Sequence, residues 1–288
     1  MTKVAILSRS SPDYLVDIVA DGMIRLLGRE NIHLAYLFPT IKPDTVSQLF
    51  DGFEVQNRFP MHEADCLVSA IRGTGNIVQD WMKKTGKKTT AILDGEDSDP
   101  VQEDFARIVG VYFKREYMRG RTYLKNIMPL PFAAIPEALP PASARAGAFF
   151  MGLHRRDPMR AAIAAVMTHM GIPVTQSQIP KESYNRRLAA SLVGVSVRGA
   201  GWDTYRYWEV PYFGAALLSQ RLPIEIPADF VDGQEAVFFQ GPEDFREKLQ
   251  ALLDHPEEAR RIAQAGQRAC LERHLSIHRA RTVLETVL

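Results

Sequence analysis

The first half of the chain alternates short apolar runs with segments whose apolar residues recur at helical spacing. Residues 3–8 (KVAILS) are an apolar run that ends at polar residues, as in a buried parallel strand. Apolar residues then recur every three or four positions up to Gly28, which predicts a helix that ends there. Four further strands are predicted at residues 32–38, 65–71, 88–94 and 110–116. This order of strand, loop and helix predicts a parallel, doubly wound sheet.

A proline-rich stretch separates the two halves of the chain. Residues 128–147 contain five prolines, which lack the N–H group that regular helices and sheets use. A chain of 288 residues is long enough for two domains. We therefore predict an N-terminal Rossmann-like domain at 1–130, a linker at 131–146 and a C-terminal Rossmann-like domain at 147–288.

The second half repeats the alternation of strands and helices. Strands are predicted at residues 148–153, 172–177, 193–199, 215–220 and 235–240. Helices are predicted to begin near Pro158, Pro242 and Pro256, and a last helix to run from about Ile277 to Leu288. The expected fold class is α/β, with two parallel-sheet domains that face each other across a cleft. Ligands of such folds bind at the carboxyl ends of the strands, so the loops after strands are the candidate sites.

Charge and composition narrow the expected partners. The formal net charge is +1, so no large uniform field favours nucleic acid or a membrane surface. No apolar stretch approaches the roughly 18 residues of a spanning helix, and the first residues lack the pattern of a signal peptide. Cys66 and Cys270 lie far apart and form no redox or metal motif. We expect a cytoplasmic protein without a cofactor, a nucleic-acid partner or a transmembrane segment.

Residues 199–209 (GAGWDTYRYWE) are the most informative loop. Asp203 follows a glycine-rich turn and is predicted to cap the next helix. Arg206 and Glu209 are three residues apart, so they share a helix face near the helix start, where phosphate binds well. Arginine can donate two hydrogen bonds to phosphate, and glutamate can accept from the two hydroxyls of a ribose. The alternative, which spacing alone favours, is a weak surface ion pair between them.

Several blocks of the second half resemble, in the same order, the C-terminal domain of GT-B glycosyltransferases. They are YNRRLAASL, VSVRGAGWDTYRYWEVPYFGAALLSQ and LLDHPEEARRIAQAGQRACLERHLSIHRA, and the exostosin-like and CgeB-like enzymes resemble them most. The likeness covers about half of the chain, from Phe149 to the end. It implies that this domain binds a nucleotide-sugar donor.

The resemblance also implies roles for individual residues. Glu209 matches the glutamate for the ribose hydroxyls, and Arg206 matches the arginine near the diphosphate. The other implied donor contacts are Gly152, Arg156, Arg160, Arg198, Gly201, Asp203 and Thr204. The alternative for each arginine is a solvated side chain. Pro211 departs from the family pattern, and it predicts a kinked helix or an offset first turn.

The N-terminal domain is expected to bind the acceptor and to supply a general base. Asp13 follows the first strand and is the predicted base; the alternative, which the residues alone favour slightly, is that it caps the next helix. Residues 94–99 (DGEDSD) look like a cation loop but lack the spacing and final glutamate of an EF-hand, so we predict no metal. Residues 72–76 (RGTGN) do not match the dinucleotide fingerprint of dehydrogenases.

The sequence thus predicts a metal-independent, hexosyltransferase-like GT-B enzyme. It would move a sugar from a nucleotide-sugar donor to an acceptor hydroxyl on a glycan, a lipid-linked molecule or a small molecule. The alternative is a non-catalytic protein that binds a nucleotide or a nucleotide sugar.

Overall fold

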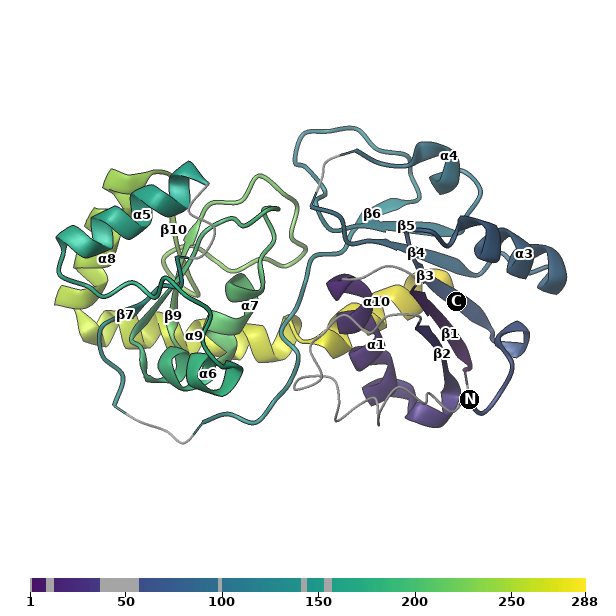
Figure 1. Cartoon of the computed structure of the whole chain (residues 1–288), viewed down its shortest axis with the longest axis horizontal. Coiled ribbons are helices and arrows are strands. Elements are labelled where there is room, and N and C mark those ends of the chain that lie inside the picture. Colours follow the sequence, from purple (N-terminus) through teal and green to yellow (C-terminus); the bar gives the residue numbers. More distant parts are fainter. Residues whose placement is uncertain (1, 9–12, 37–56, 98–99, 141–143, 153–156) are drawn as a thin grey trace. The chain divides into compact units, whose positions relative to one another are not determined.

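The chain forms two compact units, each built around its own parallel sheet (Figure 1). The first unit comprises Met1–Ile135, Ile224–Pro227 and Leu275–Leu288, and the second comprises Pro136–Pro223 and Ala228–His274. The α/β class and the parallel sheets predicted from the sequence are confirmed. The computed structural model describes residues 2–8, 13–36, 57–97, 100–140, 144–152 and 157–288.

Six of the described strands form the sheet of the first unit, in the order β2-β1-β3-β4-β5-β6. They are β1 (Val4–Ser8), β2 (Ile32–Tyr36), β3 (Cys66–Ala70), β4 (Thr90–Asp94), β5 (Val111–Lys114) and β6 (Ile127–Pro129). All are parallel, and β1, β3 and β4 are buried throughout, which explains their continuous apolar runs. The strand order reverses between β1 and β3, so the loops after these strands mark a topological switch point.

The helices of the first unit include two that come from opposite ends of the chain. The described helical segments are α1 (Tyr14–Leu27), α3 (Gly75–Thr85), α4 (Glu103–Ala106), α10 (Ser276–Val287) and the short 3-10 turns Arg29–Asn31 and Met61–Glu63. Strand β6 overlaps the start of the proline-rich stretch at 128–147, most of which we predicted to be irregular, and ends just before the predicted linker. It is an edge strand, where a proline removes no hydrogen bond from the centre of the sheet.

Helix α10 packs lengthwise on α1, within the first unit (Figure 1). The Ser276 hydroxyl donates to the carboxylate of Asp21, and the Arg279 guanidinium donates to two backbone carbonyls of the proline-rich stretch, both at 3.0 Å. The predicted domain at 147–288 is therefore wrong for this last helix. Apolar periodicity predicts that a helix forms, but not the unit on which its apolar face packs.

The close approach of α1 and α10 depends on Gly22. A Cβ atom at this position would lie 2.6 Å from the carbonyl carbon of Ser276 and 2.7 Å from the Cβ of Ala280. We expect Gly22→Ala to lower the free energy of unfolding of the first unit by roughly 2–3 kcal/mol, because the helices would be forced apart. Urea unfolding measures this change. Gly75→Ala is the control, since open space surrounds Gly75; an equal loss in both variants would contradict the packing argument.

The second unit has four described strands in the order β10-β9-β8-β7, all parallel. They are β7 (Ala148–Phe149), β8 (Val193–Ser196), β9 (Ala216–Gln220) and β10 (Val237–Phe239). The helices are α5 (Pro158–His169), α6 (Lys181–Ala190), α7 (Tyr205–Tyr212), α8 (Pro242–Asp254) and α9 (Pro256–Arg273). Prolines begin α5, α8 and α9, as predicted. The strand predicted at 172–177 is reduced to one bridge, between Met151 and Thr175.

Candidate functional site

Helix α7 carries both charged residues of the candidate donor site without a break between them. Arg206 and Glu209 lie three residues apart in this helix, and therefore on one face. Pro211 falls in the last turn, and the helix continues through it to Tyr212. The carbonyl of Glu209 accepts from the N–H of Phe213 at 2.9 Å. The proline therefore does not separate the two charged side chains.

The loop before α7 differs from the prediction at its cap. Thr204, not Asp203, is the N-cap residue of the helix. Asp203 is buried, and its Oδ1 accepts from the indole N–H of Trp208 at 2.8 Å. The Thr204 hydroxyl lies 3.2 Å from the hydroxyl of Ser196, at the end of β8. These contacts fix the loop against the carboxyl edge of the sheet.

Glu209 has a hydrogen-bond partner that sequence reasoning missed. The Tyr184 hydroxyl, from α6, donates to Oε2 of Glu209 at 2.7 Å. Among the ion pairs of the described residues, none joins Arg206 to Glu209, so the simple surface pair that spacing favours is not formed. The only sequence signal for Tyr184 was its place at the start of the YNRRLAASL block, which assigns no contact to it.

The surroundings of Glu209 set its charge. Burial raises the pKa of its carboxyl group, and the Tyr184 hydrogen bond and the charges of Arg206 and Lys181 oppose that rise. Burial beside Glu209 raises the pKa of Tyr184 well above its usual value. The tyrosine therefore keeps its proton at neutral pH and acts as a donor to the carboxylate.

Arg206 has one hydrogen-bond donor of the site that is not used. Its Nε is buried and makes no hydrogen bond within the described part of the chain. The guanidinium lies beside the Tyr184 hydroxyl and close enough to Arg160 to lower that residue's pKa. A buried donor without an acceptor costs roughly 1–3 kcal/mol, so an anion at this place would be bound favourably.

Arg160 has a structural role that the sequence did not predict. Its guanidinium donates to the backbone carbonyls of Met151, Val197 and Arg198, and thereby ties the start of α5 to the ends of the strands. Burial, and then the charge of Arg206, lower its pKa to about 10. Three N–H groups are already used by these carbonyls, so Arg160 shapes the site more than it offers donors to a ligand.

The remaining predicted donor contacts surround the same strand ends. The guanidinium of Arg198 lies 3.6 Å from Asp157 and 4.2 Å from the ring centre of Trp202. The Gly152 N–H donates to the carbonyl of Thr175 at 2.9 Å. The carbonyl of Gly201 accepts from the N–H of Gly199 at 2.9 Å. Arg156 lies outside the described residues.

In the first unit, Asp13 caps a helix at the switch point. Its Oδ1 accepts from the N–H of Val16 at 3.2 Å, and the side chain is buried. Burial raises its pKa to about 7; the charges of Asp17, Glu96 and Asp94 add to the rise and the Val16 hydrogen bond opposes it. The capping role is thus present. The same carboxyl group also titrates near neutral pH, as a general base requires.

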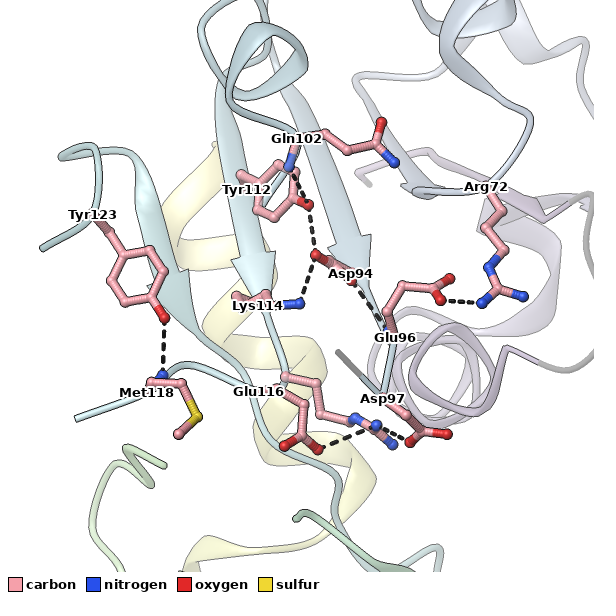
Figure 2. A network of polar contacts seen from close by, with 11 residues as sticks. Arg72, Asp94, Glu96, Asp97, Gln102, Tyr112, Lys114, Glu116, Met118 and Tyr123 are labelled. Atoms are coloured by element: carbon pink, nitrogen blue, oxygen red, sulfur yellow. Dashed lines mark hydrogen bonds and ion pairs between the residues drawn. The ribbon is translucent and has the colours of Figure 1, made fainter. Parts of the chain in front are cut away.

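A buried ion pair anchors the loop after β4, as Figure 2 shows. Asp94 accepts from the Lys114 ammonium at 3.0 Å and from the Tyr112 hydroxyl at 2.6 Å. Its second oxygen accepts from the N–H of Glu96 at 3.1 Å. Each contact fixes the position of the loop that faces Asp13.

The acidic residues of this loop pair with basic side chains. Glu96 contacts Arg72 and Asp97 contacts Arg115, which also lies 3.2 Å from Glu116 (Figure 2). In the described ranges, no three His, Cys, Asp or Glu side chains are grouped so that they could hold a metal ion. Asp99 and Ser98, part of the suspected cation loop, lie outside these ranges.

None of the helices within the described ranges is long and apolar enough to cross a membrane.

Comparisons with known proteins agree with this geometry. Residues 157–285 match a protein family described as Glycosyl transferase-like. No curated protein matches the chain.

Solved structures resemble the chain over nearly its whole length. Anabaena Alr3699/HepE in complex with UDP-glucose gives a TM-score of 0.68, with 9% identity over 99% of each chain. A glycosyltransferase from Rickettsia africae gives 0.61, with 8% identity over 99% of this chain and 97% of that one. Sucrose-phosphate synthase from Thermosynechococcus elongatus gives 0.55, with 9% identity over 99% and 98%. The chain therefore has the two-domain, parallel-sheet fold of GT-B glycosyltransferases.

Proposed function

We propose that the protein is a glycosyltransferase that moves a hexose from a nucleotide-sugar donor to an acceptor hydroxyl. The observation that carries this proposal is the buried, unbonded Nε of Arg206, on the same helix face as the Glu209 carboxylate. One group suits a diphosphate and the other a ribose diol. The match of residues 157–285 to a glycosyl transferase-like family supports the same reading.

In the proposed reaction, the second unit binds the donor and stabilises the leaving group. Arg206 and the positive end of the α7 dipole would bind the diphosphate, whose charge grows as the glycosidic bond breaks. In this proposal these groups supply the positive charge, and no metal is assigned. Oε1 of Glu209, which Tyr184 does not use, would accept a hydrogen bond from the ribose.

The first unit is proposed to bind the acceptor. Asp13 would take the proton of the acceptor hydroxyl, and its pKa of about 7 suits a base that works near neutral pH. The acceptor is a glycan, a lipid-linked molecule or a small molecule. Cys66 and Cys270 are both buried and form no disulfide, which is usual in a reducing compartment, so we place the reaction in the cytoplasm.

Arg206→Ala and Glu209→Ala should each weaken donor binding by about 10- to 100-fold, because each removes a charged hydrogen-bonding group. Calorimetric titration of UDP, ADP, GDP, CDP and the common UDP-hexoses measures this. UDP is the first choice because Alr3699/HepE binds it. Arg186→Ala is the matched control, since Arg186 is an exposed residue of α6 paired with Glu182. Unchanged affinity in both site variants would reject the donor site.

A turnover assay distinguishes a catalytic protein from one that only binds the nucleotide sugar. The proposed enzyme should release nucleoside diphosphate from one nucleotide sugar, slowly with water and faster with its acceptor. Tight binding without any release, also in the presence of acceptor extracts, would favour the non-catalytic alternative.

A further inference from the structure

We infer that Tyr184 is a positioning residue, which orients Glu209 toward the donor ribose and holds it apart from Arg206. This inference rests on the proposed function. It starts from one contact, the 2.7 Å hydrogen bond from the Tyr184 hydroxyl to Oε2 of Glu209. The two residues come from different helices, α6 and α7, so the contact joins the side chains of two helices.

The position of the tyrosine explains why the expected ion pair is not formed. An arginine and a glutamate three residues apart on a helix normally attract each other. Here the Tyr184 hydroxyl bonds to Glu209, and Arg206 lies close enough to act on the pKa of the same hydroxyl, so the tyrosine is a neighbour of both charged groups. A direct pair would use up both groups. The hydroxyl occupies only one carboxylate oxygen and leaves Oε1 for a ligand.

The tyrosine itself is held firmly. Its side chain is 7% exposed, and its ring packs edge-on against Phe149 with ring centres 5.5 Å apart. Its neighbours on α6 anchor the helix, because Asn185 and Lys181 contact the carboxylate of Glu137 at 3.0 and 3.1 Å. The hydroxyl is therefore a fixed donor, and the orientation of Glu209 is set before a ligand arrives.

The consequence is selectivity for ribose over 2′-deoxyribose. A carboxylate held in place forms a well-aligned hydrogen bond to a ribose hydroxyl without a further loss of conformational entropy. A mobile carboxylate must lose that entropy on binding, which weakens the affinity. Without the hydroxyl of Tyr184, Glu209 is free to turn toward Arg206. The ribo form should then bind only slightly more tightly than the 2′-deoxy form.

The test compares Tyr184→Phe with the wild-type protein. Both are titrated with UDP, ADP, GDP and CDP and with their 2′-deoxy forms. We expect the wild-type protein to prefer the ribo form of the nucleotide that it binds. If the single available oxygen, Oε1, binds the 2′-hydroxyl, the variant should bind the ribo form about tenfold more weakly and the deoxy form, which lacks that hydroxyl, almost unchanged.

Tyr207→Phe is the matched control. Tyr207 is another buried tyrosine of the second unit, and its hydroxyl donates to the carboxylate of Asp229. This variant should keep the full preference for ribose. Thermal unfolding of each variant shows whether it is folded.

A double-mutant cycle with Glu209→Gln tests whether Tyr184 acts through Glu209. The effects of the two substitutions on the ribo-to-deoxy ratio should be far from additive. Additive effects, an unchanged ratio in Tyr184→Phe, or a wild-type protein without preference for ribose would each overturn the positioning role. If the wild-type protein binds no nucleoside diphosphate and no UDP-hexose, the proposed function itself fails.

Discussion

Asp13→Asn is expected to stabilise the first unit by about 4 kcal/mol at pH 8 and by almost nothing at pH 4. The pKa of Asp13 is about 7 in the folded protein, against an ordinary value of 3.8. A difference of about three pH units corresponds to roughly 4 kcal/mol, at 1.36 kcal/mol for each unit. Asparagine keeps an oxygen that can accept from the N–H of Val16, so the helix cap is retained.

The direction in which stability changes with pH follows from proton binding to Asp13. Below pH 3.8 both the folded and the unfolded carboxyl group are protonated, and Asp13 carries no penalty. Between pH 3.8 and about 7 only the unfolded chain releases the proton, so the free energy of unfolding falls as the pH rises. Above about pH 7 the folded protein also carries the ionised carboxylate, and the destabilisation by this buried charge reaches its full size. Asparagine does not ionise, and the variant therefore gains most at alkaline pH.

Urea unfolding at pH 4 and pH 8, followed by circular dichroism, measures this effect. Asp157→Asn is the control, because Asp157 caps α5 in the same way but has Arg198 beside its carboxylate at 3.6 Å. It should show no gain at pH 8. Equal stability of Asp13→Asn and wild type at both pH values would contradict the buried charge.

The same substitution should lower sugar transfer by about 10²- to 10⁴-fold, the range that general bases contribute. In the wild-type protein the rate with low substrate should rise with pH and level off above about pH 7, as Asp13 loses its proton. Stability and activity thus change in opposite directions at one residue, which is common where a site holds an unfavourable charge.

Lys114→Met is expected to destabilise the first unit by about 3–5 kcal/mol. The side chains of Lys114 and Asp94 are 0% and 2% exposed, and their charges lie 3.0 Å apart. Methionine leaves the carboxylate buried with the Tyr112 hydroxyl and one backbone N–H as partners. An uncompensated buried charge accounts for a loss of this size.

Two further variants test the cause of that loss. Lys114→Met combined with Asp94→Leu replaces the pair by apolar side chains, and should recover most of the stability. Arg107→Met is the control, because the Arg107–Glu103 pair is 59% exposed at both partners and should contribute less than about 1 kcal/mol. Urea unfolding compares the variants. A double variant as unstable as Lys114→Met would show that packing, not charge, causes the loss.

The pattern of apolar residues and prolines along the chain predicted most of the fold. Continuous apolar runs identify β1, β3 and β4 because parallel strands are buried on both faces. Prolines locate the starts of α5, α8 and α9 because the first helical position needs no N–H. The sequence did not predict β6, because Pro129 is allowed only by its place at the edge of a sheet that the local pattern does not reveal.

The candidate site was less predictable, because its contacts join segments far apart in the chain. Spacing placed Arg206 and Glu209 on one helix face, but the hydroxyl that bonds to Glu209 comes from Tyr184, 25 residues before it. The dense arginines after β7 suggested phosphate contacts, yet Arg160 bonds to backbone carbonyls 37 and 38 residues away. Such long-range partners follow from the tertiary fold, which local pattern does not specify.

The packing of α10 on α1 also sets the order in which the protein can fold during synthesis. The ribosome makes the six strands of the first unit early, but Ser276 and Arg279, which bond to this unit, are made only after the whole second unit. Domains usually fold as they emerge, beginning with the N-terminal one. Here the face of the first unit around Gly22 stays uncovered until residues 275–288, which follow the second unit, have been made.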